Sequence, residues 1–190
     1  MSPLPALVVV SGPPGAGKTT LAHALAGAVG CPAVCRDEIK EGMVHAAPGF
    51  VPAPGDALTL RTLPTFFGVL ELLLRAGVTT VAEAAFQDRV WRSGLESLAG
   101  LARIRIVHCT VDADLALARK LSRLAEQPLR WAHADPEPGD ATVHAAAHNA
   151  FERLSLDVPW IEVDTTDGYQ PELKAVAAFV DSPGEPRRQA

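Results

Sequence analysis

The chain has 190 residues, of which 48% are apolar and 21% charged, and these values are typical of one globular domain with a substantial core. The net charge of −5 argues against a nucleic-acid partner, which usually requires a basic surface. The most apolar stretch, residues 58–74, is interrupted by Arg61, Pro64 and Glu71, so we expect no membrane span. With no signal-peptide pattern and three cysteines at no metal-site spacing, a cytoplasmic location is expected.

The first predicted strand, residues 6–10, leads into the best-defined motif of the chain. The motif reads Gly12-Pro13-Pro14-Gly15-Ala16-Gly17-Lys18-Thr19, and the helix after it carries Leu21, Leu25 and Val29 on one face. The pattern G-x-x-x-x-G-K-[ST] between a strand and a helix is typical of a phosphate-binding loop, in which backbone N–H groups and the helix N-terminus bind an anion. We expect Lys18 to contact the β- and γ-phosphates and Thr19 to bind Mg²⁺. The alternative is a Gly/Pro-rich turn before an ordinary helix.

Strands and helices then alternate along the chain. Further strands are predicted at residues 33–35, 78–82, 104–109 and 160–164. Helices are predicted at residues 36–43 and about 56–75, around Trp91 to Ala102, after the cap residue Asp112, around Val143 to Leu154 and from Pro171, with Gly77 ending the second of them. Residues 47–55 and about 127–140 are predicted to be loops, and residues 182–190 a disordered tail.

This alternation predicts a three-layer α/β domain over residues 1–181, with a parallel five-stranded sheet and helices on both faces. Ligands of such sheets bind beyond the carboxyl ends of the strands. There the phosphate loop, Asp37, Glu83 and the segment after Asp164 should lie together.

The phosphate loop and the segment Arg36-Asp37-Glu38-Ile39-Lys40 after the second strand resemble a known group. They are similar to the small P-loop kinases that include chloramphenicol phosphotransferases, the kinase domains of polynucleotide kinases and, more remotely, zeta-type toxins. The resemblance extends roughly to Val180 and is strongest at the phosphate loop. It implies strand order 2-3-1-4-5, a short lid at about residues 122–142, ATP and Mg²⁺ as cofactors, and transfer of the γ-phosphate to a hydroxyl of a small molecule.

The resemblance also implies roles for acidic residues at strand ends. By position Asp37 is the general base on the acceptor hydroxyl, although it could instead cap its helix. Glu83, where relatives commonly carry Asp, is expected to hold Mg²⁺ through water or to position the acceptor, or else to be a satisfied strand-end carboxylate. Lys40 is expected to bind an acidic group of the substrate or to face solvent. Phe86 and Arg89 are assigned to the acceptor pocket.

Two arginines, Arg119 and Arg123, share a helix face just before the predicted lid. In the resembling kinases lid arginines cross the phosphates, a task that suits a planar, bidentate guanidinium, whereas a solvated helix face is the alternative. Arg130 is a further candidate, and the loop at residues 164–168 occupies the place of the adenine site. The expected nucleotide-binding set is Gly12, Pro13, Pro14, Gly15, Ala16, Gly17, Lys18, Thr19, Thr20, Arg119, Arg123 and Thr165, and the expected catalytic set is Lys18, Asp37 and Arg123.

Three functions are compatible with these motifs. The first is a kinase acting on a small molecule such as an antibiotic, a nucleoside or another metabolite. The second is a polynucleotide or nucleotide-sugar kinase, the latter acting as a toxin. The third is a nucleotide-binding regulator or ATPase. A guanine-reading Asn/Thr-Lys-x-Asp motif and a strict Walker B aspartate are both missing, which argues against a GTPase switch and a mechanical ATPase. No oligomeric state is predicted.

Overall fold

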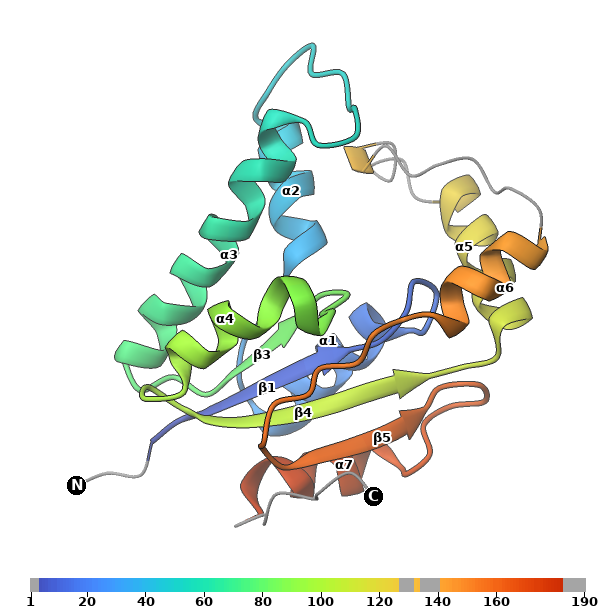
Figure 1. Cartoon of the computed structure of the whole chain (residues 1–190). Helices are drawn as coiled ribbons and strands as arrows, with labels where there is room; N and C mark the ends of the chain where they lie inside the picture. The colour runs from blue at the N-terminus through green and yellow to red at the C-terminus, as the bar shows by residue number, and fades with distance from the viewer. Residues whose placement is uncertain (1–3, 127–131, 134–140, 183–190) are drawn as a thin grey trace.

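The computed structural model describes residues 4–126, 132–133 and 141–182. Most of the predicted lid and almost all of the predicted tail lie outside these residues. The elements, in chain order, are β1 Ala6–Ser11, α1 Lys18–Val29, β2 Ala33–Cys35, α2 Arg36–His45, α3 Ala57–Arg75, β3 Thr80–Glu83, α4 Asp88–Leu98, β4 Arg103–Thr110, α5 Ala113–Glu126, α6 Ala141–Asn149, β5 Trp160–Asp164 and α7 Leu173–Asp181 (Figure 1).

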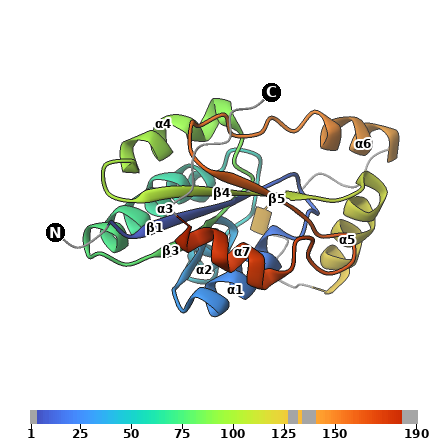
Figure 2. The same ribbon diagram turned by 90° about the horizontal axis from the view of Figure 1, so that it is seen from below.

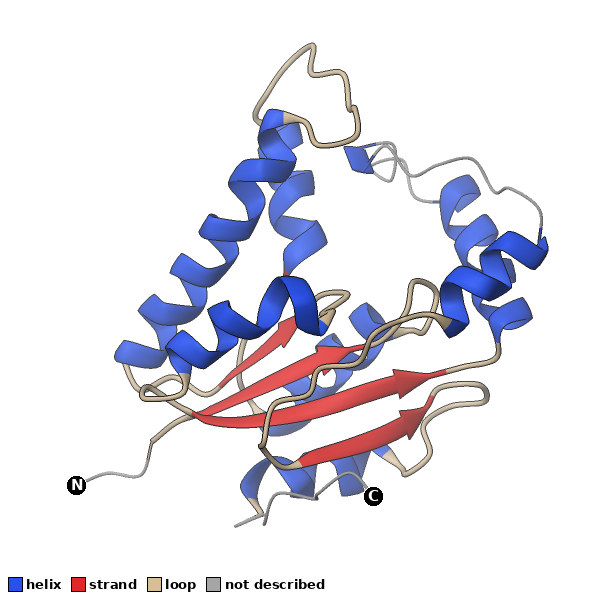
Figure 3. Cartoon of the chain, viewed as in Figure 1, coloured by secondary structure: helices blue, strands red, loops and turns tan. Residues whose placement is uncertain are grey.

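The five strands form one sheet in the order β2-β3-β1-β4-β5, and every neighbouring pair is parallel. The predicted fold class and strand order are therefore confirmed. The central strand β1 pairs on one side with β3 and on the other with β4. Since all strands point the same way, their carboxyl ends lie along one edge of the sheet (Figure 3).

Helices cover both faces of the sheet, as Figures 1 and 2 show, and the two faces of β1 contribute to different cores. One core lies under α3 and α4 and includes Leu7, Val9, Phe66, Leu70 and Trp91. The other lies under α1 and α7 and includes Val8, Val10, Leu21, Leu25 and Val176. This alternation along β1 confirms the three-layer arrangement.

Predicted helix ends are also found in the structure. Gly77 follows α3 with φ +78°, and its N–H donates to the carbonyl of Leu74, as expected of a C-terminal cap. The carboxylate of Asp112 accepts the N–H of Asp114 at 2.9 Å and so caps α5.

The prediction of one helix from Val143 to Leu154 is wrong. Helix α6 ends at Asn149, and the chain then runs over the sheet to β5 without regular secondary structure (Figure 1), with Leu154 2% exposed. None of the nine residues of α6, all of which the structure describes, is buried, and Val143 is 65% exposed. The reason is that α6 packs against α5 rather than against the sheet, so its apolar residues do not mark a core face.

Among the described residues, only helix α3 is long and apolar enough to cross a membrane by length and composition. One such helix is weak evidence, because the core helix of a soluble protein passes the same test. Phe66, Leu70 and Leu74 of α3 are buried in the core between this helix and the sheet.

Candidate active site

The phosphate loop connects β1 to α1 and packs against the end of β4 and the start of α5. A Cβ at Gly12, where φ is +153°, would lie 2.6 Å from the carbonyl oxygen of Cys109. A Cβ at Gly15, where φ is +87°, would overlap the backbone of Ala116. Glycine is therefore required at both positions by space as well as by backbone conformation. Within the loop Pro13 and Ala16 are buried, whereas Pro14 and Thr20 are exposed.

Lys18 lies at the start of α1 and turns back across the loop. Its Nζ donates a hydrogen bond to the carbonyl of Pro13 at 3.0 Å. Burial lowers the pKa of Lys18, and the negative charges of Glu83 and Asp37 act in the opposite direction. The ammonium group therefore lies within the field of both carboxylates.

Thr19 and Glu83 form the second contact of the site. The hydroxyl of Thr19 donates to Oε2 of Glu83 at 3.2 Å, and Glu83 is only 4% exposed at the end of β3. Burial raises the pKa of this carboxyl group, while Lys18 opposes the shift. A hydroxyl and a carboxylate are hard oxygen donors of the kind that Mg²⁺ prefers, so these two residues fit a magnesium site.

Asp37 is in the first turn of α2, and its side chain is 40% exposed. One carboxylate oxygen accepts from Arg36 at 2.9 Å and lies 3.9 Å from Nδ1 of His133. The N-cap of α2 is Cys35, not Asp37. Nε2 of His133 in turn lies 3.0 Å from the carboxylate of Glu41. His133 lies far from Asp37 and Glu41 in the chain, and no spacing in the sequence predicts these contacts.

Arg119 holds the loop after β5, and that loop contacts the phosphate loop through Thr165. Its Nη2 donates to the carbonyl of Thr165 at 2.7 Å, and its Nη1 donates to the Thr165 hydroxyl at 3.2 Å. That hydroxyl lies 3.2 Å from the carbonyl of Ala16, to which it can donate. Arg123, one turn further along α5, lowers the pKa of Lys18 by its positive charge. The structure thus brings both arginines and Thr165 to the side of the phosphate loop.

Comparison with known proteins shows the family and the fold of the chain. Residues 7–157 match the sequence pattern of a family described as AAA domain. The chain belongs to this family. No curated protein sequence matches it.

Solved structures that resemble this AAA domain include a "putative kinase" from Chloroflexus aurantiacus J-10-fl, with a TM-score of 0.81, 24% identity and coverage of 93% of this chain and 97% of that one. The APS kinase CysC of Mycobacterium tuberculosis, solved with AMPPNP and APS, has a TM-score of 0.65, 15% identity and coverage of 95% and 100%. The Pnkp1/Rnl/Hen1 RNA repair complex has a TM-score of 0.58, 17% identity and coverage of 78% and 45%. At these identities the similarity shows the fold. The resemblance to small P-loop kinases is confirmed.

Two residues assigned to the acceptor pocket of this AAA domain are buried instead. Lys40 is 1% exposed, and its Nζ forms an ion pair with Asp56 at 2.9 Å. Asp56 also caps α3 by accepting the N–H of Thr59 at 2.7 Å. Burial alone would raise the pKa of Asp56, but the hydrogen bonds from Thr59 and Lys40 lower it to about 2. Lys40 neither faces solvent nor presents its charge to a substrate, so we correct both expectations: it joins α2 to α3.

Phe86 is 0% exposed, and its ring lies 4.8 Å from that of Trp91, centroid to centroid, in the core under α4. Its side chain is therefore part of the core, which corrects the expected substrate contact. The Phe86 carbonyl accepts from the hydroxyl of Ser11 at 3.0 Å, so the segment after β3 is held at the end of β1. Arg89, at the start of α4, is exposed.

Proposed function

We propose that this protein is an ATP- and Mg²⁺-dependent kinase that transfers the γ-phosphate to a hydroxyl group of a small molecule. The observation that carries the proposal is the convergence of Lys18, Glu83 and Asp37 beside the phosphate loop. Phosphate binding needs only the loop N–H groups and Lys18. Phosphoryl transfer also needs a carboxylate beside the acceptor hydroxyl. The kinases among the similar structures support the same activity.

Each residue has a role in this proposal. The loop N–H groups and Lys18 bind the β- and γ-phosphates, and Thr19 and Glu83 hold Mg²⁺, which neutralises phosphate charge when bound. Asp37 accepts the proton of the acceptor hydroxyl as its oxygen bonds to the γ-phosphorus and the bond to the β-phosphate oxygen breaks, releasing ADP. Arg119 and Arg123 contact the nucleotide, with Arg123 stabilising charge during transfer, and the exposed Arg89 contacts the acceptor.

We place this activity in the cytoplasm, which supplies ATP. Cys31, Cys35 and Cys109 are free thiols, as is usual for proteins of that reducing compartment. The similarity to the RNA repair complex favours a polynucleotide acceptor as the second candidate, but the net charge of −5 makes a small molecule the better choice.

The experiment measures phosphate transfer from radiolabelled ATP to a panel of hydroxyl compounds by wild type and Asp37→Asn. Loss of a general base typically lowers the rate by about 10²–10⁴-fold, while ATP affinity should stay unchanged. Glu38→Gln makes the same carboxylate-to-amide change one residue further along α2 and should keep its activity. Lys18→Ala should lose ATP binding itself.

Two results would contradict the proposal. An Asp37→Asn variant that keeps most of its turnover would show that the base lies elsewhere. Release of phosphate to water with every compound in the panel would favour the ATPase alternative.

A further inference from the structure

Two described residues between α5 and α6, Ala132 and His133, pack on α2. Ala132 is fully buried in a small apolar cluster with Val44 of α2 and Leu58 of α3. Figure 1 shows the two residues as a short separate piece near α2. The packing of Ala132 places the next side chain, that of His133, against the same helix, where it is 4% exposed.

The His133 ring lies between two carboxylates of α2. Asp37 and Glu41 are four residues apart and therefore share one face of the helix. Nε2 of His133 lies 3.0 Å from Oε1 of Glu41, and Nδ1 lies 3.9 Å from Oδ1 of Asp37. Each ring nitrogen thus faces a different carboxylate, and one of these, Asp37, is the base of the proposed function.

The contact with Glu41 determines where the hydrogen of a neutral His133 ring lies. An ionised carboxylate only accepts hydrogen bonds, so Nε2 carries the hydrogen and donates it to Glu41. Nδ1 is then the acceptor nitrogen, and the ionised carboxylate of Asp37 is an acceptor as well. Two acceptors have no hydrogen between them, which agrees with a separation of 3.9 Å, beyond the hydrogen-bond range.

Phosphate transfer supplies the missing hydrogen. In the proposed function Asp37 takes the proton of the acceptor hydroxyl, and the resulting carboxyl group is a donor. The side chain of Asp37 is partly exposed, so it has room to rotate about its Cβ–Cγ bond and to move the ~1 Å toward Nδ1 that a hydrogen bond requires. The contact with Arg36 does not oppose this, because the carbonyl oxygen of a carboxyl group still accepts. His133 therefore stabilises the form of Asp37 that occurs during transfer.

The proton then has a path away from Asp37. A carboxylic acid ordinarily has a pKa of about 4 and an imidazole one of about 6.5, so a proton between them moves to the imidazole. Its arrival at Nδ1 gives an imidazolium ion that donates to a carboxylate on each side, and it returns Asp37 to the ionised form. Loss of this proton to water restores the neutral ring before the next turnover.

We propose that His133 is a positioning residue for the base: Glu41 fixes its ring, and Nδ1 accepts the proton that Asp37 removes from the acceptor hydroxyl. This inference rests on the proposed kinase function and adds the step that regenerates the base. The simpler alternative is that His133 only holds its own segment on α2 through Glu41.

The first test measures transfer from radiolabelled ATP to the panel compound that wild type phosphorylates fastest. His133→Gln keeps an N–H donor for Glu41 but has no group that takes up a proton, whereas His133→Ala loses both. Both variants should lower kcat about tenfold and leave KM for ATP unchanged. The loss is smaller than the ~10²–10⁴-fold expected for the base itself, because water also takes the proton from Asp37.

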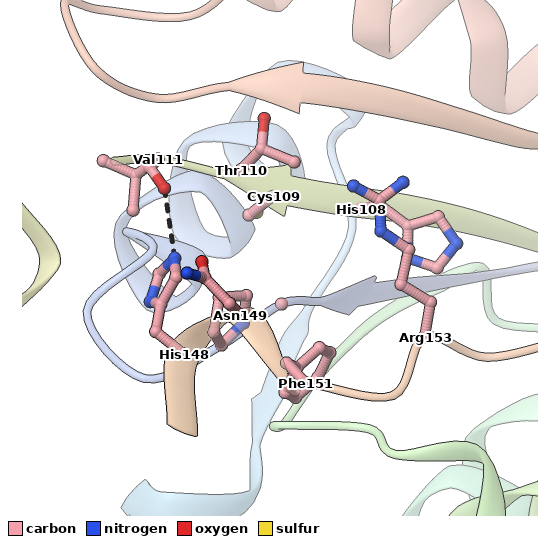
Figure 4. A pocket seen from close by; sticks show the side chains of 10 residues that line it. His108, Cys109, Thr110, Val111, His148, Asn149, Phe151 and Arg153 are labelled. Atoms are coloured by element: carbon pink, nitrogen blue, oxygen red, sulfur yellow. Dashed lines mark hydrogen bonds between the residues drawn. The ribbon is translucent and has the colours of Figure 1, made fainter. Parts of the chain in front are cut away.

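A matched control is available at another histidine. Nε2 of His148 lies 3.1 Å from the carbonyl oxygen of Val111 (Figure 4), so this ring is also held through Nε2. Val111 follows β4, whereas Asp37 follows β2, on the other side of β1 in the sheet. His148→Gln makes the same change away from the base and should behave as wild type.

The second test asks whether His133 acts through Asp37. In a protein that already carries Asp37→Asn, the further change His133→Gln should cause no additional loss of kcat. A residue that only holds its segment on α2 would add its own loss to that of Asp37→Asn.

The third test does not depend on turnover. The chain has six histidines, so ¹⁵N-histidine NMR gives few side-chain signals, and His133→Gln identifies those of His133. Above neutral pH, Nε2 should carry a hydrogen and Nδ1 should not. Asp37→Asn places an N–H donor opposite Nδ1 and should shift the Nδ1 signal. Hydrogens on both nitrogens would overturn the proposal, because Nδ1 would have no place for the proton.

The outcomes separate this inference from the proposed function. Loss of transfer in Asp37→Asn with wild-type kcat in His133→Gln would support the kinase and overturn the role of His133. A loss in His133→Ala that is absent in His133→Gln would have the same meaning, since only the contact with Glu41 would matter. Absence of transfer by wild type to every compound in the panel would overturn the proposed function, and the proton path with it.

Discussion

Glu83 is the last residue of the fully buried strand β3, and its carboxylate accepts a hydrogen bond from Thr19, the half-buried residue of α1 that binds Mg²⁺ in the proposed mechanism. Its side chain is one methylene longer than that of the Asp expected from the family resemblance. The 3.2 Å contact with Thr19 shows that the extra length still brings the carboxylate to that hydroxyl.

We predict that Glu83→Gln raises the Mg²⁺ concentration needed for half-maximal turnover by about tenfold, because one anionic ligand of a divalent ion is lost. The measurement is turnover against Mg²⁺ at saturating ATP. Thr19→Val should act in the same direction, whereas Thr19→Ser keeps the hydroxyl and should retain the wild-type requirement. An unchanged Mg²⁺ dependence in Glu83→Gln would make Glu83 a structural carboxylate.

The environment of a residue can be predicted from the sequence when it depends on a local motif, but not when it depends on contacts with distant parts of the chain. Gly12, Gly15 and Lys18 belong to a local motif, and the neighbouring strand and helix place them. Lys40 and Phe86 are different, because their surroundings come from other parts of the chain. Only the fold shows that Lys40 meets Asp56 and that Phe86 packs on Trp91. His133 beside Asp37 could not be found from the sequence for the same reason.

At the scale of elements, α2 and α3 pack against each other, and the Lys40–Asp56 pair links them. The side chains of the pair are 2% and 6% exposed, so each charge depends on the other for compensation. Removing one partner of such a buried pair typically destabilises a protein by about 3–5 kcal/mol.

We predict that Lys40→Met lowers the free energy of unfolding by about 3 kcal/mol, measured by urea denaturation. The double variant Lys40→Met/Asp56→Asn should recover most of the loss, because Asn is uncharged and still caps α3. Arg75→Ala breaks an exposed pair with Glu71 on the same helix and should cost at most about 0.5 kcal/mol. A loss in Lys40→Met as small as that of Arg75→Ala would show that the pair contributes little.

Elements were predictable where a pattern and a burial requirement coincide. The strands are short apolar runs because both faces of the sheet are covered, and their order follows from the family resemblance. Helices α5 and α6 differ. They pack mainly on each other, so the exposed Leu121 and Val143 do not mark a face toward the sheet. Periodicity alone does not distinguish a helix on the sheet from one at its edge.

At the scale of the whole molecule, a histidine in a sheet strand couples folding to pH. His108 lies on β4 with its neighbour Glu162 on β5, and Arg153 approaches it from the chain after α6. Burial, with Arg153 adding to it, lowers its pKa from 6.5 to about 4. Between these two values the unfolded chain binds a proton that the folded chain does not bind, so acid favours unfolding.

We predict that stability is constant with respect to His108 above pH 6.5 and falls as the pH decreases from 6.5 to 4. At 1.36 kcal/mol for each unit of pKa shift, this single group accounts for at most about 3 kcal/mol. The measurement is urea denaturation of wild type and His108→Leu at several pH values across this range. The variant should show a flatter profile, with a smaller residual fall because burial also lowers the pKa of His144. Parallel profiles for the two proteins would mean that the pKa of His108 is the same in the folded and the unfolded chain, so that burial does not lower it.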